Sequence, residues 1–284
     1  MEKSEEIKLD KFLMLKYHFY ILRSYSHNSR MQKQPITLKK SLDILELFAK
    51  MGISLSVREI SSHVNLPVST VYRYVSTLAQ RDFIEYDHSD RKYRLGMNLI
   101  RLGYVAKRQL EIHRVAYPIM EPLAHETGET VLLTVRKGIR AIVAEVVDSG
   151  RAGIKLAMNP GDTLPLCSCA LTRPLIAYLS QEEINSILRT SPPKRFTEHT
   201  ITDVEAIKNE LRRIRRQGYA YSDQEVTSGA RGIGAPVWDY SGTVIASLNL
   251  SGSLHNFPKS KIHNFLKLLL KATKQCSLKM GFKQ

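Results

Sequence analysis

The residues of this chain best suited to chemistry with another molecule lie near its front, within residues 55–95. If a helix begins at residue 68, Val71, Val75 and Leu78 share one face of it at helical spacing. The opposite face and its margins carry hydroxyl, phenol and guanidinium groups, on Ser69, Thr70, Tyr72, Arg73 and Thr77. Short polar side chains and an arginine at the start of a helix suit contacts with base edges and phosphates in the major groove of DNA.

The neighbouring sequence contains the elements that would position such a recognition helix. Ser56 and Glu59 match the capping box of a preceding helix, and the Asn-Leu-Pro at 65–67 ends that helix and starts the next. Residues 83–86 and 91–95 read as two strands around a polar turn, and their basic side chains would lie beside phosphates: Arg91, Lys92 and Arg94. With a supporting helix from residue 37, these elements predict a winged helix-turn-helix over residues 31–95. The pattern alone also allows an ordinary helical hairpin with a solvated ribbon.

The composition favours a polyanionic partner and a protein without a membrane segment. Lys and Arg outnumber Asp and Glu by 42 to 27, which gives a net charge of +15. No run of about 18 apolar residues is present, and the 3 cysteines are neither a disulfide framework nor spaced for zinc. We therefore expect a cytoplasmic protein with reduced thiols, no cofactor and no bound metal. Residues 1–30 have no clear period and are expected to form a poorly ordered extension, with Met31 as a hypothetical start of translation.

The order of the remaining elements predicts a linker and a second domain. An amphipathic helix over residues 96–116 is the expected linker, and its apolar side would pair with a second copy in a dimer. Pro118 marks the entry to a domain over residues 117–284 that begins with a helix. Strands are expected at 130–136, 139–147, 154–158, 219–224, 233–238 and 244–250, and further helices at 170–179, 182–188, 204–217 and 259–280. This order predicts an α+β domain with a mainly antiparallel sheet.

Two features of the second domain suit a small acid. Backbone N–H groups at the start of the helix expected from residue 170 would form a seat for an anion. Asn249 and Ser251, two apart on an expected strand, would face the same side and hydrogen-bond a carboxylate or hydroxyl.

Motifs for catalysis or nucleotide binding are missing from the sequence. The glycines at 229, 232 and 234 are not followed by the Lys-Ser/Thr of a phosphate loop. Nucleophile and base types are scattered without a hydrolase motif, at Asp162, Cys167, Ser168 and His199. We therefore expect no catalytic residues. The alternative that stays open is a small-molecule-binding protein, or an enzyme using the C-terminal pocket, with a degraded DNA-binding module.

Several strings resemble the IclR-type bacterial transcriptional regulators, over residues 37–280. They are VSTVYRYVSTLAQRDFIEYD and KYRLG in the front module, GETVLL and LPLCSCALTRPLIAYL in the middle, and QGYAYSDQEVTSGARGIGAPVWDYSGTVIASLNLSG near the end. The resemblance implies a winged-helix domain, a linker helix, and an effector domain whose small organic acid, aromatic or sugar-derived, alters affinity for a near-palindromic operator. It also implies a homodimer, or a dimer of dimers, on double-stranded DNA.

By position, the resemblance places the effector contacts on Ala170, Leu171, Ser222 or Asp223, Gly232, Asn249 and Ser251. Three departures from the family pattern concern the same pocket. Thr172-Arg173 stands where the family often has Gly-Lys, Gly232 stands where a cysteine is frequent, and Asn249 replaces a common serine. The sequence thus leaves open the identity of the effector and whether the protein is a repressor or an activator.

Overall fold

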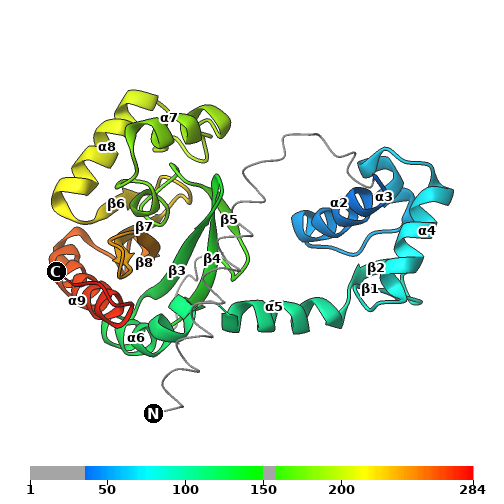
Figure 1. Ribbon diagram of the computed structural model, residues 1–284, viewed down its shortest axis with the longest axis horizontal. Helices are drawn as coiled ribbons and strands as arrows, with labels where there is room; N and C mark the ends of the chain where they lie inside the picture. The colour runs from blue at the N-terminus through cyan, green and yellow to red at the C-terminus, as the bar shows by residue number, and fades with distance from the viewer. Residues whose placement is uncertain (1–35, 110, 150–157, 284) are drawn as a thin grey trace, which may run out of the picture. The chain divides into compact units, whose positions relative to one another are not determined.

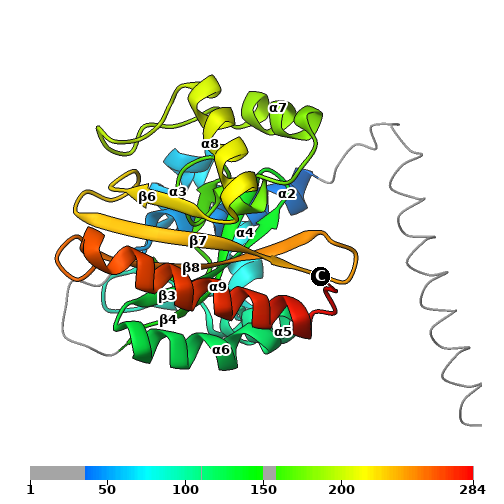
Figure 2. The same ribbon diagram turned by 90° about the vertical axis from the view of Figure 1, so that its left-hand side faces the viewer.

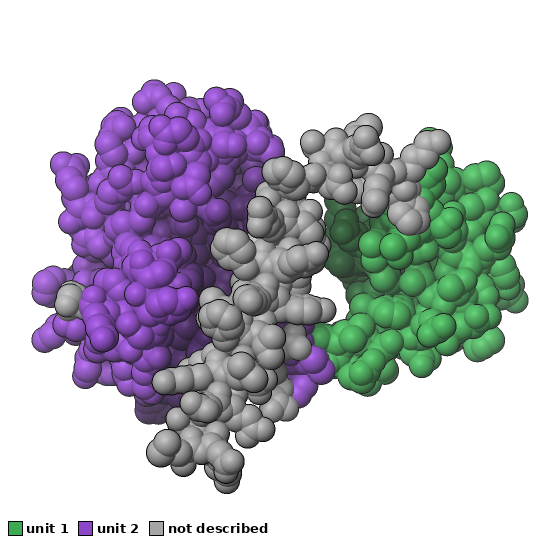
Figure 3. Space-filling view, in the orientation of Figure 1, with its two compact units in different colours: residues 1–103 green, residues 104–284 purple. Residues whose placement is uncertain are grey.

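The computed structural model describes residues 36–109, 111–149 and 158–283 of the chain (Figure 1). The chain forms two compact units, the first ending at Gly103 and the second beginning at Tyr104 (Figure 3). The division falls within helix α5 (Met97–Gln109). The extension expected at residues 1–30, and nearly all of the strand expected at 154–158, lie outside the described residues.

The first unit is a winged helix-turn-helix, as the sequence predicts. Its elements follow in the order α2 (Ile36–Met51), α3 (Val57–Val64), α4 (Val68–Ala79), β1 (Ile84–Asp87) and β2 (Lys92–Leu95). Their apolar faces meet in one core that contains Ile44, Phe48, Ile60, Val71, Val75 and Leu78. Burial of such side chains, at roughly 1.5–3 kcal/mol each, stabilises helices that are too short to persist alone.

The turn between α3 and α4 forms as the capping residues and the proline predict. Ser56 Oγ accepts a hydrogen bond from the Glu59 amide at 3.3 Å, and Glu59 Oε2 accepts one from the Ser56 amide at 2.7 Å. Helix α3 ends at Asn65 in the left-handed conformation, with φ at 51°, and Pro67 then precedes α4. The local sequence therefore sets both the start of α3 and the start of α4.

The wing is attached to the helix-turn-helix through backbone hydrogen bonds. Strands β1 and β2 pair antiparallel, with Ile84 opposite Leu95. Leu55, just before α3, exchanges two backbone hydrogen bonds with Tyr93 of β2, at 2.9 and 2.8 Å. This bridge fixes the ribbon beside the start of α3, so the basic residues of β2 have a defined position relative to the helices.

The second unit is an α+β domain built on a 6-stranded antiparallel sheet in the order β5-β4-β3-β8-β7-β6. The strands are β3 (Thr130–Lys137), β4 (Arg140–Val147), β5 (Thr163–Pro165), β6 (Ala220–Asp223), β7 (Ala230–Trp238) and β8 (Val244–Ser253). Helices α6 (Glu111–Thr127) and α9 (Ile262–Lys279) cover one face of it (Figure 2). On the other side lie α7 (Gln181–Thr190), α8 (Val204–Gln217) and the segment 166–179 with its 3-10 turn η1 (Arg173–Leu175). A second 3-10 turn, η2 (Lys259–Lys261), leads into α9. None of the helices in the described part of the chain has the length and apolar character to span a membrane.

Helix α6 begins before the proline that was expected to start it. It runs from Glu111 through Pro118 and Pro122, so residues 96–116, expected as one linker helix, contribute to both α5 and α6. Both prolines lie on the exposed side of α6. The carbonyl groups that lose an N–H partner therefore face solvent, and the buried side, which includes Ile112 and Ala116, packs without interruption.

The helix expected at 170–179 is not formed, and that prediction was wrong. These residues make a series of turns around η1. Pro174 has no N–H to donate to the carbonyl of residue 170, and the Cys169 carbonyl accepts from the amides of Thr172 and Arg173 at 3.2 and 3.1 Å instead. The expected seat for an anion at a helix N-terminus is therefore absent from this segment. The short edge strand β5, which leads into it, was also not predicted.

The segment 166–179 lies directly on the sheet because position 234 has no side chain. A Cβ at Gly234 would overlap the carbonyl oxygen of Ala170 and the side-chain oxygen of Asn249. From the neighbouring strand β3, Thr134 Oγ1 donates a hydrogen bond to the Leu171 carbonyl at 2.6 Å. This close approach places the turns of the segment over strands β3, β7 and β8.

We predict that Gly234→Ala destabilises the second unit by about 1–3 kcal/mol, the usual cost of forcing an extra methyl group into a packed interior. Thermal unfolding followed by the fluorescence of Trp238, the single tryptophan of the chain, measures this effect. Gly103→Ala is the matched control, because a Cβ there has no neighbour within 4 Å and a helix favours alanine over glycine. Equal melting temperatures for the two variants would contradict the packing argument.

Candidate nucleic-acid interface and ligand cavity

The face of α4 that the sequence assigns to DNA is open to solvent. Four of its five predicted contacts are exposed and one is half-buried: Ser69, Tyr72, Arg73 and Thr77, and then Thr70. Tyr72 keeps 59% of its surface accessible. On the opposite face, Val71, Val75 and Leu78 are buried in the core of the unit. The amphipathic pattern read from the sequence therefore describes the helix as it folds.

The start of α4 offers unpaired backbone donors. Pro67 occupies the N-cap and makes no side-chain capping hydrogen bond, while the amides of Thr70 and Val71 bond to its carbonyl at 2.9 and 3.0 Å. Helix geometry leaves the amides before them without an intrahelical partner, at the positive end of the helix dipole. Arg73 follows one turn later, and no carboxylate of the described residues pairs with it. An anion such as a DNA phosphate suits this end of the helix.

The basic residues of the wing fall into two groups. Lys92 Nζ pairs with Glu59 Oε1 at 3.3 Å, and Arg94 Nε pairs with Glu85 Oε1 at 2.7 Å. Arg91 lies at the turn in the left-handed conformation, with φ at 57°, and is exposed. Within the described part of the chain, no carboxylate pairs with Arg91. Lys92 and Arg94 thus brace the ribbon, and Arg91 is the wing cation that is available to a phosphate.

A cavity of about 430 Å³, counted to its open mouth, lies between the sheet and the segment 166–179. This volume includes open solvent at the mouth, and the space that admits the centre of a water-sized molecule is about 40 Å³. Strands β3, β5, β6, β7 and β8, the segment and the loop after β6 all contribute to the lining, which consists of Leu132, Met158, Leu164, Cys169, Leu171, Ser222, Glu225, Val226, Thr227, Ala230, Arg231, Gly232 and Ser251.

Four of the predicted effector contacts line the cavity, and the strand register brings the last three of them together: Leu171, Ser222, Gly232 and Ser251. Ser222 of β6 lies opposite Gly232 of β7, which lies opposite Ser251 of β8. Directly opposed residues point to the same face of a sheet, so these three form a row across the floor of the cavity. A Cβ at Gly232 would lie 3.2 Å from Ser251 Oγ. The missing side chain at 232 therefore leaves room in the middle of the row.

The structure separates Ser222 from Asp223, which the sequence could not do. Side chains alternate along β6, so Asp223 points to the other face of the sheet. There its Oδ2 pairs with Arg231 Nη2 at 2.9 Å and accepts a hydrogen bond from the Tyr221 hydroxyl at 3.0 Å. Asp223 is not among the residues that line the cavity.

Ala170 and Asn249 also stand outside the lining residues. The Ala170 carbonyl lies against Gly234, where the segment touches the sheet. Asn249 is fully buried, and its amide donates to the carbonyls of Leu132 and Ser247 at 3.2 and 3.0 Å. Its side chain joins strands β3 and β8 below the segment, so both residues support the wall of the cavity.

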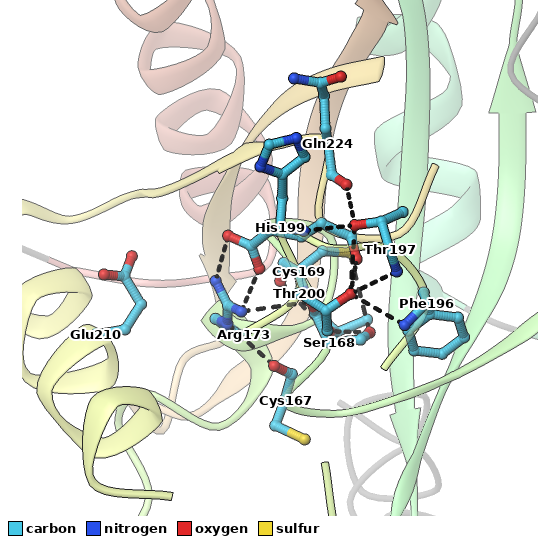
Figure 4. Close-up of polar contacts among 12 residues, drawn as sticks. Cys167, Ser168, Cys169, Arg173, Phe196, Thr197, His199, Thr200, Glu210 and Gln224 are labelled. Carbon is cyan, nitrogen blue, oxygen red and sulfur yellow. Dashed lines mark hydrogen bonds and ion pairs between the residues drawn. The ribbon is translucent and has the colours of Figure 1, made fainter. Parts of the chain in front are cut away.

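Sequence reasoning missed a buried ion pair between Glu225 and Arg173, which is labelled in Figure 4. Arg173 is fully buried and donates from Nη1 and Nη2 to the two carboxylate oxygens of Glu225, and from Nε to the Cys167 carbonyl at 3.0 Å. Thr200 Oγ1 donates to the Glu225 carbonyl at 2.6 Å. Burial raises the pKa of the Glu225 carboxyl, and the Arg173 guanidinium opposes that rise. The Thr172-Arg173 departure was visible in the sequence, but no local pattern links it to position 225.

Both units match models of one protein family. Residues 37–88 match the IclR helix-turn-helix domain, and residues 105–278 match the C-terminal domain of the bacterial transcriptional regulator IclR. The chain is 30% identical over 246 residues to the HTH-type transcriptional regulator XynR of Escherichia coli K12, which covers 87% of this chain and 97% of the relative. These matches cover the same two units as the sequence strings that resemble the family.

Solved structures share the fold. The crystal structure of the Thermotoga maritima IclR aligns with a TM-score of 0.70 at 29% identity, over 87% of this chain and 99% of that chain. An IclR homologue from Microbacterium hydrocarbonoxydans, complexed with 4-hydroxybenzoate, aligns with a TM-score of 0.75 at 24% identity, over 86% of this chain and 98% of that chain. At that identity the second comparison shows the common fold alone.

A winged helix-turn-helix followed by a domain with a ligand cavity defines a DNA-binding transcriptional regulator with an effector-binding C-terminal domain, and not an enzyme. This chain belongs to the IclR family. The family and the fold class expected from the sequence are thereby confirmed.

Glu59 provides a test of how the wing is attached. Hydrogen bonds from the Ser56 amide and hydroxyl, and then the Lys92 ammonium, lower its pKa from 4.5 to about 2. A depressed carboxylate pKa stabilises the folded unit above the unfolded pKa, and this contribution is lost as the pH falls from about 4.5 to about 2. We predict that the Ser56 amide resonance titrates with a midpoint near 2 in the wild type and at a higher pH in Lys92→Met. A wild-type midpoint at the ordinary value would exclude this arrangement.

Proposed function

We propose that the chain controls transcription as a homodimer that places its two α4 helices in successive major grooves of a near-palindromic operator. The observation that carries this proposal is the exposed face of α4, with Arg73 free of carboxylate partners among the described residues and Arg91 free on the wing. The proposed contacts with DNA are Ser69, Thr70, Tyr72, Arg73, Thr77 and Arg91, with Lys92 and Arg94 shaping the wing. The protein would act in the cytoplasm, where it meets chromosomal DNA.

Exposed apolar side chains on two helices support a dimer. On α2, Ile36, Leu38 and Leu42 keep 74%, 58% and 51% of their surface accessible. On α5, Met97 and Ile100 keep 68% and 65%. A run of apolar residues on the outside of a helix favours contact with another copy of the chain. Light scattering of the full chain distinguishes a dimer from a dimer of dimers.

For the effector, we propose a small organic acid in the cavity, in contact with Leu171, Ser222, Gly232 and Ser251. The other three predicted residues would support the cavity without touching the effector, because each contacts other protein groups: Ala170, Asp223 and Asn249. The resemblance alone allows either an aromatic or a sugar-derived acid. The 4-hydroxybenzoate complex of a homologue supports an aromatic acid as the first candidate.

We predict that Arg73→Ala weakens binding to the operator by about 1–3 kcal/mol and relaxes its sequence preference, because an arginine on a recognition helix contacts a base or a phosphate near it. Chromosomal mapping of bound sites supplies the operator, and fluorescence anisotropy at fixed salt measures the affinity. Gln80→Ala is the control, since Gln80 is exposed at the end of α4 and outside the proposed contacts. Equal affinities for the two variants would show that Arg73 does not contribute to recognition of the operator.

Arg91→Ala should act differently from Arg73→Ala. Because a phosphate contact carries no sequence information, we expect similar losses of affinity on specific and unrelated DNA. The slope of log affinity against log salt should become shallower by about one counterion. A loss confined to the operator sequence would show that Arg91 reads bases.

A bound effector should raise the melting temperature of the second unit, since it binds the folded state alone; at a hundred times its Kd the gain is about 2.7 kcal/mol. We predict that Ser222→Ala reduces this rise, because the cavity loses a hydroxyl from its floor. Ser228→Ala is the control, since Ser228 is exposed and does not line the cavity. If the acids found by screening shift all three proteins equally, the effector binds elsewhere.

A further inference from the structure

One of the charged residues that line the cavity is neutralised inside the protein. Glu225 lies at the cavity, and its two carboxylate oxygens accept hydrogen bonds from Nη1 and Nη2 of Arg173, the first at 3.0 Å. Arg173 is fully buried and is not part of the lining. The pair is therefore closed on itself and presents neither a free cation nor an unpaired anion to a ligand.

Arg231, the other charged residue of the lining, turns its guanidinium away. It lies opposite Asp223, whereas the next pair, Ser222 and Gly232, faces the cavity. Alternation along the strands therefore directs the Arg231 side chain to the other face of the sheet. There it donates hydrogen bonds to the Phe257 carbonyl at 2.7 Å and to Asp223 at 2.9 Å. Its contribution to the cavity is backbone.

Among the described residues, the remaining polar side chains of the lining are neutral. Ser251 Oγ donates its proton to the Arg231 carbonyl at 3.1 Å and keeps its lone pairs. The hydroxyls of Ser222 and Thr227 make no hydrogen bond to any described residue, so both can donate to a ligand. Burial raises the pKa of the Cys169 thiol, which stays protonated and uncharged at neutral pH. Such a set can satisfy one carboxylate group.

Apart from Gly232, which has no side chain, the rest of the lining is apolar: Leu132, Met158, Leu164, Leu171, Val226 and Ala230. Aliphatic side chains offer no partner to a hydroxyl or to a second carboxylate. A polar or charged group pressed against them would lose its hydration without replacement. An apolar body, by contrast, is favoured there.

We propose that the effector of this protein is a monocarboxylate with an apolar body, and that the cavity rejects both dicarboxylates and polyhydroxylated sugar acids. This inference rests on the proposed function, which supplies the cavity as the effector site. The charges and hydrogen bonds of the lining favour an aromatic or aliphatic acid over a sugar acid. The carboxylate is held by hydroxyl groups, and no arginine of the described residues binds it.

Calorimetric titration of the full chain with matched acids tests this inference. The pairs are 4-methylbenzoate with terephthalate and pentanoate with glutarate, in which one methyl group is replaced by a carboxylate; gluconate represents the sugar acids. We expect at least one monocarboxylate to bind, with a Kd at least about a hundredfold lower than those of its dicarboxylate partner and of gluconate. Comparable affinities, or no binding by either monocarboxylate, would overturn the proposal.

A variant that adds a cation tests the same idea in the opposite direction. Thr227 is exposed and lines the cavity, so Thr227→Lys places an ammonium group at its rim without disturbing the core. We expect the dicarboxylate to gain at least about tenfold in affinity relative to its monocarboxylate partner, since the ammonium group also replaces the Thr227 hydroxyl as a donor to the first carboxylate and only the dicarboxylate has a second charge to pair. Ser228→Lys, next in the chain but outside the lining, should leave both affinities unchanged. No gain in Thr227→Lys, or an equal gain in Ser228→Lys, would count against the inference.

The proposed function and the proposed class of effector can be overturned by different results. Absence of sequence-specific DNA binding by the wild-type chain would overturn the proposed function. A chain that binds its operator but takes monocarboxylates and dicarboxylates equally well would overturn only the proposed class of effector.

Discussion

The second unit depends on one close approach, where the segment 166–179 lies on the sheet over Gly234. No other residue type fits at 234 without moving the Ala170 carbonyl or the Asn249 side chain. Because the segment sits this low, Thr134 and Asn249 are buried, and they use their hydrogen-bonding capacity on strands and segment instead of on solvent. The cavity lies beside this contact, which sets the distance between the segment and the sheet.

The buried pair of Arg173 and Glu225 fixes the second wall of the cavity. It joins the segment to the loop after β6, and Thr200 holds the same loop from outside. Buried ion pairs add little net stability, because both charges lose their hydration, but breaking one leaves a buried charge unpaired and costs several kcal/mol. The pair therefore selects one arrangement of the two walls. It also removes both charges from the ligand's side, which leaves recognition to hydroxyl groups and apolar surface.

In the first unit, the carboxylate of Glu59 contacts two elements. Glu59 caps the start of α3 and pairs with Lys92 of the wing, so helix and ribbon are held at one point. Paired cations shape the wing, whereas Arg73 and Arg91, without carboxylate partners among the described residues, are available to an anion. Separating bracing charges from available charges lets a small unit keep its shape while it presents charge to a polyanion.

The sequence by itself determined what depends on neighbours in the chain. Helical spacing and the capping box gave α3 and α4 with their faces, and the strand and helix order gave the α+β class. Local patterns failed at 170–179, where tertiary burial of a proline-containing segment produced turns instead of a helix. Only the tertiary structure decided that Ser222 rather than Asp223 faces the cavity, that Asn249 supports it from behind, and that Arg173 meets Glu225. The physical reason is that strand register, close approach and charge pairing join residues far apart in the chain, and no periodicity records which residues will meet.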